Sequence, residues 1–203
     1  MSATLDMERA FAHMQRHIDR ISGITDEEFA AVRPFFTPTL LKRKELLYRQ
    51  GEICRVFAFV SEGCLRTCHT TRDGDEFTIY FAFGDWWIGD PESFYGRTPA
   101  RFGCQALEPS TLLVADREHF EGALDRVPAF NEFYKKKMQT SYAASQKKLV
   151  EAHTETAEEK YLKLLKSAPE IVQRIPQVYI ASYLGIKPQS LSRIRKSIAE
   201  RRF

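Results

Sequence analysis

The stretch Ile175-Pro-Gln-Val-Tyr-Ile-Ala-Ser-Tyr-Leu-Gly-Ile-Lys-Pro-Gln-Ser-Leu-Ser-Arg-Ile-Arg-Lys-Ser-Ile198 decides how the end of this chain folds. Pro176 suits the first turn of a helix, and Gly185 tolerates the left-handed backbone with which that helix would end. Pro188 suits the first turn of a second helix, which we expect to run from Gln189 to about Ala199. The stretch therefore predicts two short helices around a tight turn.

The second of these helices separates an apolar stripe from a polar face. Leu191, Ile194 and Ile198 recur at helical spacing and form the stripe. The polar face carries residue types that bond base edges and phosphates in a DNA major groove: Lys187, Gln189, Ser190, Arg193 and Lys196, with Pro188 and Ser192 beside them. This pattern predicts a helix-turn-helix whose second helix is the recognition helix. The alternative is a helical hairpin with an ordinary solvated basic face.

Length and composition indicate a soluble globular protein. The chain has 203 residues, of which 12% are aromatic and 28% are charged. The net charge of +3 is small, but after Ile186 the basic residues face only one acid, Glu200, so positive charge gathers at one end. No apolar run is long enough to span a membrane, and the first residues lack the pattern of a signal peptide. We expect a cytoplasmic protein without a membrane partner.

Cysteines and histidines give no metal or catalytic signature. The four cysteines, Cys54, Cys64, Cys68 and Cys104, form no C-x-x-C pair, and we expect free thiols. His13 and His17 are four residues apart on a predicted helix and offer a metal pair, but two surface histidines are the favoured interpretation. The sequence contains no G-x-S-x-G motif and no P-loop. We therefore predict a protein that is not an enzyme and has no resident cofactor or metal.

The first 116 residues change from helical to strand-like periodicity. An amphipathic helix is expected from Leu5 to Ile21, and the capping box Thr25-Asp-Glu-Glu28 predicts a helix from Asp26 to about Val32. The strands that follow are predicted at Val56–Val60, Gly63–Cys68, Phe77–Phe83 and Thr111–Ala115, with a hairpin turn at Asp73-Gly74. Short strands with glycines at their corners favour an antiparallel roll or barrel.

A long helix is predicted from Pro128 to about His153. One side carries Phe130, Phe133, Met138, Ser141, Ala144, Ser145, Leu149 and Ala152. Small residues in the middle of this stripe favour a symmetric dimer seam; the alternative is a helix packed only on its own roll. Its lysines, Lys135, Lys136, Lys137, Lys147 and Lys148, are interpreted as a solvated face. A second capping box, Thr156-Ala-Glu-Glu159, predicts a helix from Ala157 to about Ser167.

Three motifs, in this order, resemble the Crp/Fnr family of bacterial transcription regulators. They are Gly51-Glu52 with Val60-x-x-Gly63-x-x-Arg66, then Ile88-Gly-Asp-Pro-Glu-Ser-Phe94 followed by Ala100-Arg-Phe-Gly-Cys-Gln-Ala106, and last Ile180 to Arg193. The resemblance implies an α+β chain: a β-roll of the cyclic-nucleotide-binding, RmlC-like jelly-roll type, a long dimerisation helix and a C-terminal helix-turn-helix. It predicts a sensor domain at 1–126, the dimerisation helix at 127–153 and the DNA-binding domain at 154–203. No residues follow for a full β-wing.

The resemblance also implies partners and roles. Family members are homodimers that read a near-palindromic operator in double-stranded DNA, and activators among them contact RNA polymerase. By position, Gln189 and Arg193 would touch base edges, while Lys187, Ser190 and Lys196 would hold phosphates. The family's usual arginine is replaced by Pro188, so we expect a different operator sequence.

The phosphate-binding cassette departs from the family pattern. Its candidate effector-pocket residues are Gly89, Asp90, Pro91, Ala100, Arg101 and, on the long helix, Ser145. Asp90 replaces the acid that holds the ribose in cyclic-nucleotide binders. Ala100 stands where those proteins have the phosphate-binding arginine, and Arg101, one position later on a strand, would face the other way. We expect a small effector other than cyclic AMP, or none. The alternatives are a cyclic-nucleotide-responsive regulator that uses Arg101 and Asp90, and a ligand-binding module without DNA function.

Overall fold

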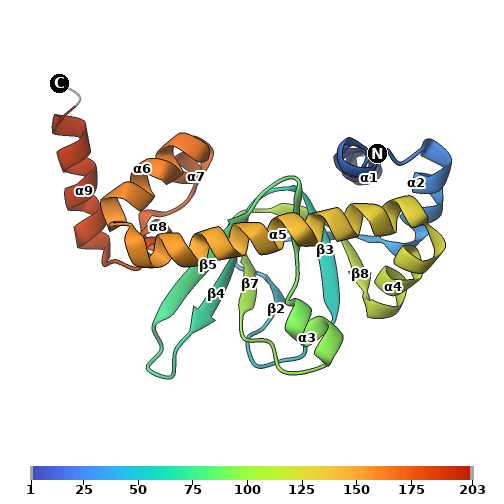
Figure 1. Ribbon diagram of the computed structural model, residues 1–203, viewed down its shortest axis with the longest axis horizontal. Coiled ribbons are helices and arrows are strands. Elements are labelled where there is room, and N and C mark those ends of the chain that lie inside the picture. Colours follow the sequence, from blue (N-terminus) through green and yellow to red (C-terminus); the bar gives the residue numbers. More distant parts are fainter. Residues whose placement is uncertain (1, 202–203) are drawn as a thin grey trace. The chain divides into compact units, whose positions relative to one another are not determined.

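The computed structural model describes residues 2–201 (Figure 1). The chain divides into two compact units. The first unit comprises the chain up to residue 67 together with residues 81–143. The second comprises residues 68–80 and the chain from residue 144 onward. No helix among the described residues is long and apolar enough to cross a membrane.

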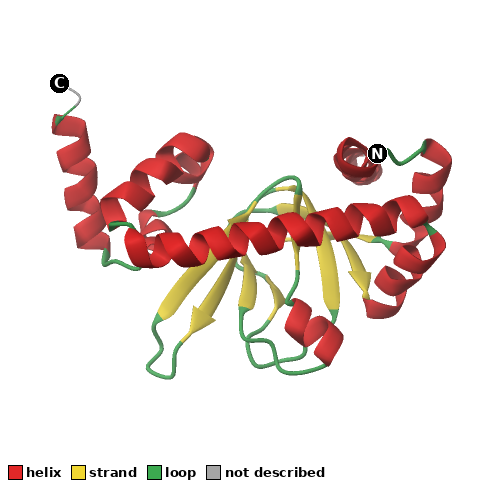
Figure 2. Ribbon diagram, viewed as in Figure 1, coloured by secondary structure: helices red, strands yellow, loops and turns green. Residues whose placement is uncertain are grey.

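Helices and strands alternate in blocks along the chain (Figure 2). The helices are α1 (Ser2–Ser22), α2 (Asp26–Val32), the 3-10 helix η1 (Arg33–Phe35), α3 (Pro91–Gly96), α4 (Arg117–Arg126), α5 (Pro128–Thr154), α6 (Ala157–Ser167), α7 (Pro169–Arg174), α8 (Gln177–Leu184) and α9 (Pro188–Glu200). The strands are β1 (Thr37–Leu41), β2 (Leu46–Tyr48), β3 (Val56–Glu62), β4 (Leu65–Thr70), β5 (Glu76–Ala82), β6 (Trp86–Ile88), β7 (Gly103–Ala106) and β8 (Ser110–Asp116).

The strands form two four-stranded sheets with the orders β1-β8-β3-β6 and β2-β7-β4-β5. The pairs β1–β8, β3–β8 and β3–β6 are antiparallel, with Phe59 of β3 opposite Leu113 of β8. Gly63 forms the corner between β3 and β4 with a φ of 97°, and a Cβ there would lie 2.2 Å from Ser110 Oγ. The predicted α+β class, a β-roll with flanking helices, is confirmed.

Several elements were not predicted: β1, β2, β6, β7, α3 and α4. The strand β6 contains only three residues, and β2 also only three, so neither shows a measurable alternation. Helix α4 buries only Phe120 and Ala123, which is too few apolar positions for a helical stripe. Its one local signal is Asp116, whose carboxylate accepts the backbone N–H of His119 as an N-cap. Helices α1, α2, α5, α6, α8 and α9 agree with their predicted ranges to within a few residues.

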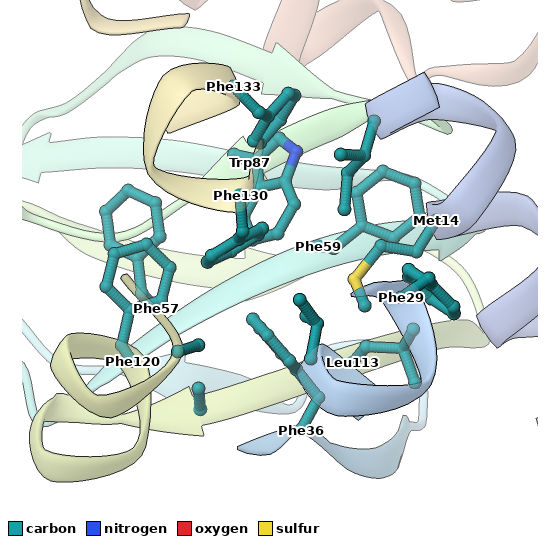
Figure 3. Close-up of a cluster of buried hydrophobic side chains, with 14 of the residues drawn as sticks. Met14, Phe29, Phe36, Phe57, Phe59, Trp87, Leu113, Phe120, Phe130 and Phe133 are labelled. Atoms are coloured by element: carbon teal, nitrogen blue, oxygen red, sulfur yellow. The ribbon is translucent and has the colours of Figure 1, made fainter. Parts of the chain in front are cut away.

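Aromatic side chains dominate the core of the first unit. Figure 3 shows Trp87 of β6 between Phe59 of β3 and Phe130 and Phe133 of α5. The ring centre of Trp87 lies 5.4 Å from those of Phe59 and Phe133. The rings meet in tilted and edge-to-face pairs, the arrangements that aromatic quadrupoles favour. This core fastens α1, α4 and the first half of α5 onto the β1-β8-β3-β6 sheet.

His17 corrects the expectation of two surface histidines. His17 is only 6% exposed. Its Nδ1 lies 3.3 Å from Asp85 Oδ1, and the Nε2 of His13 lies 2.8 Å from the same oxygen. Burial lowers the pKa of His17 to about 4, although the nearby Asp85 carboxylate opposes this shift. The reason for the error is that His17 occupies the same helical face as Met14 and Ile18, which face the core. Among the described residues, no group of three or more His, Cys, Asp or Glu side chains is placed to hold a metal.

Helix α5 buries only its beginning. Phe130 and Phe133 are less than 2% exposed, whereas every residue from Ser141 to Val150 is exposed. The predicted stripe therefore divides into a part that serves the core of its own unit and a part that is uncovered. Lys137 corrects the interpretation of a uniformly solvated lysine face, because it is half-buried and this burial lowers the pKa of its ammonium group.

The four cysteines form no disulfide, as predicted, and all four are buried. Burial raises the pKa of the Cys54 thiol, which keeps it protonated and unreactive at neutral pH. These thiols therefore act as small apolar side chains of the roll.

Candidate nucleic-acid interface and effector pocket

Helices α8 and α9 form a helix pair around a short turn. Gly185 ends α8 with a φ of 71°, and the N–H of Ile186 donates to Ala181 O at 3.0 Å. Ala181 is fully buried and so is Leu191 at the start of α9. A residue in the left-handed conformation followed by an apolar residue is a common way to end a helix, because the N–H groups after it bond the last carbonyls of the helix. This cap fixes where the chain leaves α8 and turns into α9.

The polar face of α9 is exposed. Lys187 is the N-cap, Pro188 is the first helical residue, and Ser190 is half-buried. Gln189, Ser192, Arg193 and Lys196 are exposed at positions i, i+3, i+4 and i+7, so they share one face. Lys196 Nζ lies 3.9 Å from Glu200, and Arg193 forms no ion pair with any described residue. The helix thus offers an amide, a hydroxyl and two cations on one side.

The hairpin of β4 and β5 contacts α8 through the hydroxyl of Ser182. The N–H of Thr78 donates to Ser182 Oγ at 2.9 Å, and Ser182 Oγ donates to Glu76 O at 2.7 Å. Strand β5 is the edge of its sheet, so these backbone groups have no neighbouring strand to bond. The sequence does not predict this contact, because the two partners are about a hundred residues apart and a serine in the middle of a short helix is a weak signal by itself.

Asp90 uses both carboxylate oxygens within the cassette. It is 4% exposed, and its Oδ1 accepts the N–H of Ser93 at 3.1 Å as the N-cap of α3. Its Oδ2 accepts the N–H of Arg101 at 3.1 Å. In both hydrogen bonds a backbone N–H donates to the carboxylate, so Asp90 holds the start of α3 and the segment at Arg101 close together. Pro91 follows as the first helical residue of α3.

The side chain of Arg101 lies on the surface. It is 69% exposed, and its Nε lies 3.0 Å from Glu92 Oε2. Ala100, in contrast, is buried. At Gly89, a Cβ would lie 2.5 Å from the ring of Phe57, so this glycine makes room for a core aromatic ring. The cassette residues belong to the first unit, and Ser145 belongs to the second.

Arg66 is a buried cation in the roll that the candidate residues did not include. It is 4% exposed, and its Nε and Nη2 donate to Gln105 Oε1 at 3.2 and 3.0 Å. Gln105 in turn donates to Lys44 O at 3.2 Å. Both residues stand within the motifs quoted above, but their pairing requires the adjacent strands β4 and β7.

The second unit also contains a pocket of about 950 Å³. Side chains of α5 and α6, with Ile79 of β5 and Tyr183 of α8, line it. The Nζ of Lys148 donates to Ile79 O at 3.1 Å and lies 5.0 Å from the centre of the Tyr183 ring. Of the predicted effector-pocket residues, this pocket contains Ser145.

Comparison with known proteins assigns the roll to a class. Residues 38–127 match the family model of the cyclic nucleotide-binding domain. A search of curated proteins found no match. Many solved structures share the fold, several of them over 82–91% of this chain, so the chain combines a cyclic nucleotide-binding domain with the fold of Crp/Fnr regulators, which confirms the resemblance.

Three of these structures come from bacterial regulators. The c-di-GMP-responsive regulator CLP of Xanthomonas campestris has a TM-score of 0.70 at 12% identity, over 87% of this chain and 92% of its own. FixK2 of Bradyrhizobium japonicum has a TM-score of 0.66 at 15% identity, over 82% and 85%. A putative regulator of the Crp/Fnr family from Eubacterium rectale has a TM-score of 0.67 at 14% identity, over 88% and 85%. At these identities the likeness concerns the fold.

Proposed function

We propose that this protein is a sequence-specific DNA-binding transcription regulator of the Crp/Fnr type. It acts as a cytoplasmic homodimer, with no catalytic activity of its own, and reads a near-palindromic operator through Gln189 and Arg193. Lys187, Ser190 and Lys196 hold the DNA backbone. If the protein activates transcription, RNA polymerase is a further partner.

The exposed polar face of α9 carries this proposal. A helix that served only the fold would need Leu191 and its apolar neighbours, but not Gln189 and Arg193 side by side on the opposite face. An exposed arginine without an ion-pair partner keeps its bidentate donors available for guanine, and a glutamine can pair with adenine. The solved relatives supply the same architecture.

Selection of operators from random double-stranded DNA, followed by fluorescence anisotropy, tests the proposal. Affinity for the selected operator should fall steeply with salt, because phosphate contacts release counterions. Arg193→Ala should cost about 1–3 kcal/mol and relax base preference at one position, whereas Lys196→Ala should weaken all sequences about equally. Arg43→Ala is the matched control, because Arg43 is also exposed and forms no bond with described residues. Unchanged operator affinity in Arg193→Ala would show that α9 is not the recognition helix.

The dimer part of the proposal rests on α5. Tyr142, Leu149 and Val150 of α5 are 68%, 57% and 61% exposed, and large apolar side chains left uncovered on one helix favour an interaction surface there. Pairing of two α5 helices would cover this surface and set two recognition helices about one DNA turn, roughly 34 Å, apart.

A cyclic-nucleotide-responsive regulator is the second candidate, because residues 38–127 match the cyclic nucleotide-binding domain. The cassette geometry argues against it: Asp90 is occupied by two backbone N–H groups, and Arg101 pairs with Glu92. We therefore expect no cyclic AMP binding tighter than roughly 100 μM, since a missing buried charge partner lowers affinity by orders of magnitude. Calorimetry decides between the two. Micromolar binding that Arg101→Ala abolishes would establish the second candidate.

A further inference from the structure

The first unit has a pocket of its own, where the ends of three elements meet. Its volume of about 620 Å³ falls within the range of small-molecule sites in proteins. It is lined by residues 53–55 before β3, by the end of α3 with Phe94 and Arg97, and by the start of α4 with Asp116 before it. All the lining residues belong to the first unit and none to α5, so the proposed dimer seam does not use this surface.

Two of the three carboxylates in the lining are already bonded within the chain. Asp116 accepts a backbone N–H of α4 at 2.9 Å as its N-cap, and Glu121 Oε1 lies 2.8 Å from Arg117 Nε. The Nη1 of Arg117 also donates to Tyr95 O at 2.9 Å, so this guanidinium is held in place from two sides. The third carboxylate, Glu118, is exposed and forms no ion pair with any described residue.

Two arginines in the lining are free to bind a ligand. Arg55 and Arg97 are exposed, and their guanidinium groups form no hydrogen bond or ion pair with any described residue. A guanidinium offers a planar fork of N–H donors that matches the two oxygens of a carboxylate. The pocket therefore presents two free cations and, in Glu118, one free anion.

Arg97 occupies a backbone position that favours glycine. It is the C-cap of α3, with a φ of 54° and a ψ of 32°, in the left-handed region. Helices commonly end in glycine at such a position, because a Cβ disfavours this conformation. The local backbone would therefore be served at least as well by glycine, so the guanidinium, and not the backbone, accounts for an arginine here.

We infer that this pocket binds a free amino acid with an apolar side chain, whose carboxylate pairs with Arg55 and Arg97 and whose ammonium pairs with Glu118. The ligand's side chain covers Ile53, which is 43% exposed although it lines a concave surface. A simple anion is a poorer ligand, because Glu118 repels it, and a simple cation leaves both arginines without a partner. The inference does not depend on the proposed DNA-binding function.

Calorimetry with the full chain in low salt, without DNA, tests the site with L-leucine and L-phenylalanine as probes. We expect at least one of them to bind with a Kd below about 1 mM. Its amide, which lacks the carboxylate, and its N-acetyl derivative, which lacks the ammonium, should each bind about tenfold more weakly or worse.

The sharpest variant is Arg97→Gly. It removes the guanidinium and suits the left-handed backbone, so a loss of binding is not explained by loss of the fold; we expect about tenfold weaker binding or worse. Lys44→Gly is the matched control, because Lys44 is an exposed cation with a φ of 73° in the turn between β1 and β2, outside the pocket. Glu118→Gln should weaken the amino acid and leave the N-acetyl derivative no weaker.

No binding by either amino acid, equal binding of the amide, or unchanged binding in Arg97→Gly would overturn the inference. An N-acetyl derivative that binds as tightly as the amino acid would also overturn it, because the pocket would then select only an anion. Operator affinity is measured without amino acid. Failure of this pocket and failure of the proposed DNA-binding function are therefore distinguishable.

Discussion

The buried histidine on α1 predicts a loss of stability at mildly acidic pH. The ring of His17 lies 5.5 Å from that of Phe59 and 5.6 Å from that of Phe133, with Asp85 as its polar neighbour. The other charged or titratable groups near His17 are Arg20, His13 and Lys137. All three disfavour a positive charge on the His17 ring. The neutral ring is therefore the form that the folded protein prefers.

The magnitude follows from the pKa values. His17 has a pKa of about 4 in the folded protein and 6.5 as its ordinary value. As pH falls below 6.5, the unfolded chain takes up a proton that the folded protein does not, so the free energy of unfolding falls. Between about pH 7.5 and pH 5 this linkage amounts to about 2 kcal/mol. The lowered pKa of Asp85 matters only at still lower pH, because its ordinary value is already 3.8.

Urea unfolding followed by tryptophan fluorescence measures this effect in the first unit, since both tryptophans, Trp86 and Trp87, lie on β6. The wild type should lose about 2 kcal/mol between these pH values, and His17→Gln should lose less than half of that. His153→Gln, which removes an exposed histidine, should behave as the wild type does. An equal loss in His17→Gln and wild type would refute the assignment of the titration to His17.

Three further perturbations test the roll, the hairpin contact and the dimer. Gly63→Ala would place a Cβ 2.6 Å from the backbone of Ser110, so it should lower the free energy of unfolding of the first unit by about 2 kcal/mol or more in the same urea assay. In Gly74→Ala the new Cβ meets no atom within 4 Å, so this control should lower the free energy of unfolding less. Ser182→Ala removes two hydrogen bonds to β5 and should destabilise the second unit by about 1–3 kcal/mol. The expected readout is faster amide hydrogen exchange in residues 76–80, and unchanged exchange there would contradict the role of this contact. Ser141→Glu should bring like charges of the two copies together and raise the dissociation constant of the proposed dimer at least tenfold in analytical ultracentrifugation. Gln139→Glu, on the opposite face of α5, should leave that constant unchanged, and equal effects of the two variants would argue against an α5 seam.

Local signals predicted the helices well. Thr25 and Thr156 each form the capping box that their sequences indicate, with Glu28 and Glu159 as partners, and α2 and α6 have the predicted ranges. Gly185 has the left-handed conformation that the end of α8 requires. These features depend on residues within one or two helical turns, so the sequence contains all of the partners.

Predictions failed where the partner lies far along the chain. The face of α1 that carries His17 reads as an ordinary helix surface until β3 and α5 cover it with Phe59 and Phe133. Lys137 reads as a solvated lysine, but it is half-buried, and this burial lowers the pKa of its ammonium group. In both cases burial in the folded chain, and not the residue type, shifts the pKa.

The sequence by itself determined the class of this protein: helices, a glycine-cornered roll, and a helix-turn-helix with a basic face, because period, caps and turn residues act locally. Tertiary structure alone decided which charged groups are withdrawn from water. It turned Asp90 into a cap for α3, left Arg101 on the surface, and buried Arg66 beside Gln105. Burial and long-range hydrogen bonding depend on elements that meet only in the folded chain. A charged side chain in a binding site differs from one on an ordinary surface in these two properties.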